Sequence, residues 1–104
     1  MSESEILWSR VERLYPLYAG LDEQTLILKL SEEVGEVAEA YIGMRGLNPR
    51  KGVCRSRDDL LDELADVMVT AAVAMCGVTG GDPAAARAHL ERRLEAVAER
   101  AGVL

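Results

Sequence analysis

The stretch Leu26–Tyr41, LILKLSEEVGEVAEAY, decides the fold, because its apolar residues recur every three or four positions along its length. With Leu30 taken as the centre of this stripe, the other apolar side chains fall within about 60° of it: Leu26, Ile27, Val34, Val37 and Tyr41. Glu33 and Glu36 share one flank of the stripe, with Lys29 beside them. The stretch therefore predicts an amphipathic helix with two carboxylates at the edge of its buried face.

A second stretch repeats this arrangement around Leu64. Its predicted buried face consists of Leu60, Leu61, Leu64, Val67, Met68, Ala71 and Met75. Glu63 and Asp66 follow one flank of that face, as Glu33 and Glu36 do in the first stretch. If these flanks meet in a shared groove, the four carboxylates repel each other unless cations bind, and Mg²⁺ prefers such oxygen ligands. The pattern predicts a divalent-cation site; the alternative is that both flanks are ordinary solvated surfaces.

Helix start and stop signals divide the 104-residue chain into four helices and no strands. The helices are expected from Ser2 or Ser4 to Pro16, from Asp22 to about Met44, from Ser56 to about Val78, and from Asp82 to about Gly102. Residues 1–104 are interpreted as a single all-α domain of the four-helix bundle type. Since a domain of this size buries a limited core, oligomerisation is expected as well.

The connection Gly43–Arg57 is the one long loop, and it carries five basic residues and no acidic residue before the next helix begins. These residues are Arg45, Arg50, Lys51, Arg55 and Arg57. Together with Lys29 they are candidates for binding phosphate groups, because guanidinium and ammonium donors suit phosphate oxygens. The alternative is a solvated basic segment, or one that pairs with the acids of a second subunit.

The net charge of −6 argues against nucleic acid or an anionic membrane surface as the main partner, since both repel an acidic protein. The two cysteines, Cys54 and Cys76, have no metal-ligand spacing and are interpreted as free thiols in a reducing compartment. The N-terminal residues MSESE have neither the basic nor the apolar region of a signal peptide. The sequence favours a cytoplasmic protein.

The run Lys29–Ala40 (KLSEEVGEVAEA), followed by Asp62–Val67 (DELADV), resembles the MazG-type all-α nucleoside triphosphate pyrophosphohydrolases. This superfamily also includes dimeric dUTPases and phosphoribosyl-ATP pyrophosphohydrolase. The resemblance covers residues 25–75 and rests on an ExxE motif, a gap that is long for the family, and an ExxD motif. The motif positions here are Glu33, Glu36, Glu63 and Asp66.

The resemblance implies that these four acids are catalytic and bind Mg²⁺, with Mn²⁺ as a substitute. It also implies hydrolysis of a nucleoside triphosphate to monophosphate and pyrophosphate, by a homodimer or a homotetramer built from two dimers. Trp8 and Tyr15 are candidates to line a base pocket, with core packing as the alternative. Two other interpretations remain: a phosphoribosyl-ATP pyrophosphohydrolase, and a non-catalytic dimeric helical module that binds a protein partner.

Overall fold

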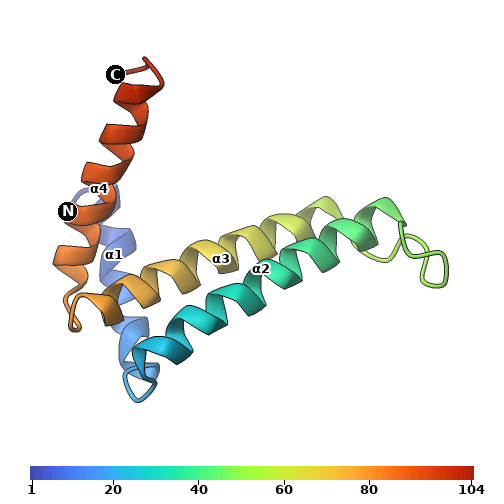
Figure 1. The fold of residues 1–104 in the computed structure, drawn as a ribbon, viewed down its shortest axis with the longest axis horizontal. Helices are drawn as coiled ribbons and strands as arrows, with labels where there is room; N and C mark the ends of the chain where they lie inside the picture. Colours follow the sequence, from blue (N-terminus) through green and yellow to red (C-terminus); the bar gives the residue numbers. More distant parts are fainter.

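A computed structural model describes all residues from 1 to 104 and contains helices and no strands, which confirms the all-α class. Its elements are α1 (Glu3–Leu14), the short 3-10 helix η1 (Tyr15–Leu17), α2 (Glu23–Arg45), α3 (Arg57–Val78) and α4 (Pro83–Arg100). The two long helices, α2 and α3, lie side by side in opposite directions and are joined by the loop 46–56 (Figure 1). The helices α1 and α4 lie across the other end of this pair.

Each α-helix begins at a predicted residue, because a side-chain oxygen there accepts a hydrogen bond from a backbone N–H of the first turn. The pairs are Ser2 with Glu5, Asp22 with Thr25, Ser56 with Asp59, and Asp82 with Ala85. At Ser56 the capping box is complete, since Asp59 also accepts from the Ser56 N–H at 2.8 Å. The α2 helix ends at Gly46, whose φ of 65° lies in the left-handed region that favours glycine.

The core lies where α1, α3 and α4 meet, and it continues to the start of α2. One buried cluster consists of Trp8, Val11, Cys76 and Ala86, and a second consists of Leu26, Val73 and Ala74. Tyr15 packs against both clusters and links them. Small residues bring the helices close together: a Cβ added at Gly77 would lie 2.6 Å from Cδ1 of Leu26.

The four helices of one chain do not form a single bundle. Gly80 and Gly81, both with positive φ, turn the chain sharply after α3, and α3 and α4 are bent by 117° relative to each other. The α2–α3 pair is therefore covered by α1 and α4 only at the end where these two helices cross it (Figure 1). As a result the predicted buried face of α3 is partly open: Leu64 is 45% exposed and Met68 is 74% exposed.

No single helix is both long and apolar enough to cross a bilayer; α3 and α4 meet that criterion only when taken together, across their bend.

Candidate metal centre

Three of the four predicted carboxylates meet in the groove between α2 and α3. One oxygen each from Glu33, Glu36 and Glu63 lies within 4.8 Å of the other two. Glu33 and Glu36 share a flank of α2 because residues three apart lie on the same side of a helix, and Glu63 reaches them from α3. All three side chains are half-buried. We call Glu33, Glu36 and Glu63 the carboxylate cluster.

Two oxygens of the carboxylate cluster are buried without a hydrogen-bond partner. They are Oε2 of Glu33 and Oε2 of Glu63. A buried oxygen without a donor costs free energy, and neighbouring carboxylates add mutual repulsion. A divalent cation would bind the unpaired oxygens and would also offset the repulsion between the carboxylates. A set of carboxylate oxygens suits a hard ion such as Mg²⁺.

Burial is the main cause that raises the pKa of Glu33 above its ordinary value, and the charge and close approach of the Glu36 carboxylate and the charges of Asp66 and Glu32 add to it. The pKa of Glu63 is also raised, first by burial and then by the close approach and charge of the Glu36 carboxylate and the charge of Asp66. Arg55 opposes this shift by lowering the pKa of Glu63. Both carboxylates therefore hold protons more tightly than an exposed glutamate does.

Asp66 lies at the edge of the carboxylate cluster. Its side chain is exposed, and it is not among the groups whose oxygens meet within 4.8 Å. Its charge still raises the pKa of Glu33 and of Glu63, so it is close enough to act on both.

Two cations flank the carboxylate cluster, and each comes from a different end of the groove. Lys29, one turn before Glu33 on α2, is half-buried and lines a pocket of about 90 Å³ with Glu33, Tyr18 and Thr70. Arg55, which precedes α3, lowers the pKa of Glu63. The groove therefore combines a negative centre with a positive charge on either side.

The other basic residues of the loop have different surroundings. Arg45 donates to the hydroxyl of Tyr41 at 3.2 Å and forms no ion pair with an acid. Lys51 lines a pocket of about 360 Å³ that Arg55 also lines. Arg50 and Arg57 are exposed and form no ion pair.

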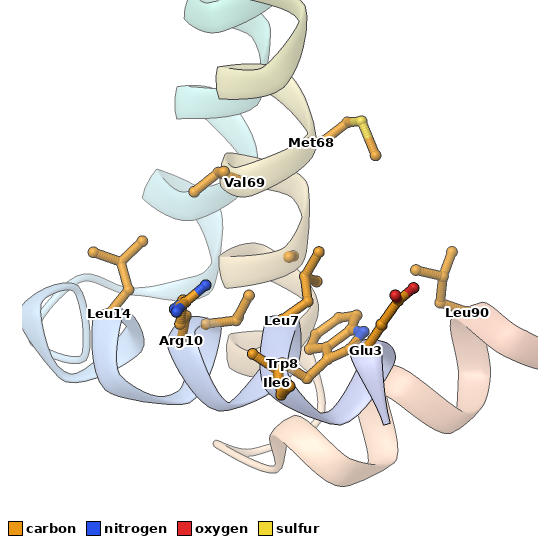
Figure 2. A pocket seen from close by; sticks show the side chains of 11 residues that line it. Glu3, Ile6, Leu7, Trp8, Arg10, Leu14, Met68, Val69 and Leu90 are labelled. Carbon is orange, nitrogen blue, oxygen red and sulfur yellow. The ribbon is translucent and has the colours of Figure 1, made fainter. Parts of the chain in front are cut away.

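Trp8 is 7% exposed and belongs to the core between α1, α3 and α4. It also lines the largest pocket, about 530 Å³ and mostly apolar, shown in Figure 2, where Leu7, Met68 and Leu90 are labelled among the other lining residues. None of the three members of the carboxylate cluster lines this pocket. The structure therefore places Trp8 in the core, in a pocket that is separate from the carboxylate cluster.

Two residues near the cluster have roles that their sequence positions do not reveal. Glu39 is mostly exposed, yet its Oε1 lies 4.0 Å from a guanidinium nitrogen of Arg55. The α2 helix was expected to end at about Met44 and ends at Arg45, so Gly43 lies inside its last turn, where it is buried. A Cβ at Gly43 would lie 2.5 Å from Cγ of Arg55.

No protein-family model matches this chain, and no curated protein or solved structure shows significant similarity to it.

Proposed function

We propose that this protein is an Mg²⁺-dependent nucleoside triphosphate pyrophosphohydrolase that removes ribo- or deoxyribonucleoside triphosphates from the nucleotide pool. The proposal combines the ExxE and ExxD motifs of the sequence with the geometry of the α2–α3 groove. Its substrate would bind along this groove, with its negative phosphates between Lys29 and Arg55.

The observation that carries the proposal is the convergence of Glu33, Glu36 and Glu63 within 4.8 Å, with a buried and unpaired oxygen on two of them. Acidic side chains on a helical surface normally point to water and repel each other little. Here three carboxylates are held half-buried against one another on two packed helices, and this arrangement is stabilised once positive charge is bound.

In the proposed reaction a water oxygen bonds to the α-phosphorus, and the bond from that phosphorus to the oxygen bridging the β-phosphorus breaks. The bridging oxygen leaves with pyrophosphate. Mg²⁺ ions bound by Glu33, Glu36, Glu63 and Asp66 would supply charge neutralisation and a more acidic water. One of these carboxylates orients the water, and Lys29 neutralises phosphate charge from the Glu33 side.

We further propose that the active protein is a homodimer, or a homotetramer made of two dimers. The open apolar side of the α2–α3 pair includes Val34, Leu64 and Met68. A second copy would cover this side and leave the acidic groove open to the substrate.

The test is product analysis by chromatography after incubation with a panel of canonical and modified NTPs and dNTPs and Mg²⁺. Monophosphate and pyrophosphate are expected from a subset of the panel. Glu36→Gln is expected to abolish turnover and to weaken Mn²⁺ binding at least about tenfold, because it removes one ligand of the cluster. Glu32→Gln is the matched control, since Glu32 is exposed and outside the cluster.

Mn²⁺ binding that is equal in the wild type, Glu36→Gln and Glu32→Gln would contradict the metal centre itself. Mn²⁺ binding that depends on Glu36, without turnover of any nucleotide in the panel, would retain the metal centre and direct the substrate search to phosphoribosyl-ATP.

A further inference from the structure

The position of Arg55 distinguishes it from the other basic residues of the loop 46–56. Arg55 is half-buried, whereas Arg50 and Lys51 are exposed. Its guanidinium faces Glu39 of α2 at 4.0 Å, and its charge lowers the pKa of both Glu63 and Asp59 of α3. Arg55 therefore reaches acids of both helices from one position.

Gly43 creates the space for Arg55. The loop is fixed to α2 by a hydrogen bond from the Cys54 N–H to the Gly43 carbonyl oxygen, 3.0 Å long. A Cβ at Gly43 would lie 2.5 Å from Cγ and 3.2 Å from Cβ of Arg55, so any larger residue there displaces the stem of the arginine. The loop also has its own bonds, from the amides of Lys51 and Gly52 to the carbonyl oxygen of Asn48. These contacts fix the position of the Arg55 side-chain stem against α2.

Arg55 also lines a pocket that no member of the carboxylate cluster lines. This pocket, about 360 Å³ in volume, extends from Gly35 and Glu39 of α2 to Asn48, Lys51 and Arg55 of the loop. Its lining offers two cations and an amide, which are donors for phosphate oxygens. The pocket and the carboxylate cluster share one neighbour, because Arg55 lines the pocket and its charge also lowers the pKa of Glu63.

The pairing of Arg55 with Glu39 is weak. The separation of 4.0 Å is at the limit for an ion pair, and the Glu39 side chain is 64% exposed. An exposed pair of this kind contributes little stability and is readily exchanged, whereas a guanidinium binds phosphate oxygens with paired, charge-assisted hydrogen bonds. A phosphate group entering beside the cluster would therefore displace Glu39.

We propose that Arg55, which is positioned by the contact of the loop with Gly43, binds the phosphates that leave as pyrophosphate. When no ligand is bound, Glu39 forms an ion pair with Arg55. The inference rests on the proposed function, because it assigns an orientation to the same substrate. The phosphate tail points toward the loop 46–56, and the nucleoside lies toward the Lys29 end of the groove, where Tyr18 and Thr70 line the small pocket.

The test measures binding by calorimetry with two probes, Mn²⁺ alone and inorganic pyrophosphate with Mg²⁺. Arg55→Gln is expected to weaken pyrophosphate binding at least about tenfold, the loss of one charge-assisted pair, while Mn²⁺ binding changes less than about twofold. Arg50→Gln removes the same charge from the same loop, and less than about threefold weakening is expected because Arg50 contacts no acid. Glu39→Gln is expected to tighten pyrophosphate binding, since it frees Arg55.

Gly43→Ala gives a second measurement that keeps every charge. It is expected to weaken pyrophosphate binding as Arg55→Gln does, in protein whose helical circular dichroism is unchanged. Combining Gly43→Ala with Arg55→Gln is expected to add less than about twofold, because both changes remove the same contact.

Equal losses from Arg55→Gln and Arg50→Gln would overturn the proposal, since the loop would then act through its total charge. A larger loss from Lys29→Gln than from Arg55→Gln would also overturn it, because the phosphate tail would point the other way. Both results are distinct from a failure of the proposed function, which is shown by Mn²⁺ binding that does not depend on Glu36.

Discussion

Glu33 and Glu63 make the stability of the metal-free protein depend on pH. Both have a pKa raised by burial and by neighbouring acids, so the folded state holds these protons more tightly than the unfolded chain, whose glutamates titrate near 4.5. The stabilisation is complete below that value and is lost as the pH rises through the raised pKa values. In EDTA, the midpoint of thermal unfolding is expected to fall across this window.

The check is a series of thermal scans of the wild type and of Glu33→Gln/Glu63→Gln from about pH 4.5 to 7.5. The double variant should lack most of the decline and be the more stable protein at pH 7.5 without metal. Mn²⁺ affinity of the wild type should rise over the same window, because metal binding requires the carboxylates to lose their protons. Parallel curves for the two proteins would show that these carboxylates titrate normally.

Replacing either of two helical glycines with alanine is expected to change the stability of the protein, in opposite directions at the two positions. A Cβ at Gly77 would meet Leu26 at 2.6 Å, so Gly77→Ala is expected to destabilise the protein by about 1–3 kcal/mol through overpacking. A Cβ at Gly35 meets nothing within 4 Å, so Gly35→Ala is expected to stabilise it by up to about 1 kcal/mol through helix propensity. Urea unfolding of both variants at one protein concentration measures the difference. Destabilisation by Gly35→Ala would mean that a second chain approaches this position.

At the scale of the elements, the start of α3 is stabilised by a capping box. Ser56 and Asp59 cap this helix reciprocally, at 3.1 Å and 2.8 Å. Ser56→Ala removes one of these bonds and is expected to lower the free energy of unfolding by about 1 kcal/mol. Because Arg55 directly precedes this cap, the same variant should also weaken pyrophosphate binding. Ser31→Ala, at an exposed position inside α2, is the control and should change stability little.

The helices could be predicted from the sequence because their signals are local. Asp22, Ser56 and Asp82 each bond to an amide three residues ahead, and this spacing is visible in the sequence. The meeting of Glu33 and Glu36 with Glu63 was also predictable, since helical periodicity places these acids on the flanks of two apolar stripes. The packing of those two stripes then brings the flanks together.

Other features depend on the conformation of turns and could not be predicted in this way. Five basic residues share one loop, and only its folding against Gly43 separates Arg55 from Arg50. The bend after α3 depends on the positive φ of Gly80 and Gly81, whose consequence for the direction of α4 is not encoded in any periodicity. Apolar periodicity also predicts which face of a helix is apolar, but it does not predict which part of that face another helix covers. Leu64 was therefore predicted to be buried and is 45% exposed.

At the scale of the whole molecule, one chain is more extended than a typical protein of its size. Its radius of gyration is 16.3 Å, against about 13 Å expected for this length. Its accessible surface is 7464 Å², whereas a monomer of 11.3 kDa exposes about 5,700 Å². The difference of about 1,700 Å² is comparable to the surface that one subunit buries in an obligate dimer.

We therefore expect the protein to sediment as a dimer or tetramer at micromolar concentration. Met68→Lys places a charge in the open apolar side of α3, where the side chain is 74% exposed in one chain, and is expected to shift the protein toward monomer. Leu17→Lys is the control, because Leu17 is 79% exposed in η1, outside that side. Sedimentation velocity distinguishes the species. A wild type that is monomeric at every concentration would contradict this expectation.

The position of Trp8 has a practical consequence for spectroscopy. It is the only tryptophan in the chain, and it is buried where α1 packs against α3 and α4. Its indole emission therefore reports the docking of the two shorter helices, and no other residue contributes to the signal at long excitation wavelengths. A shift to longer emission wavelength that precedes the loss of helical ellipticity during unfolding would show that these two helices detach before α2 and α3 separate.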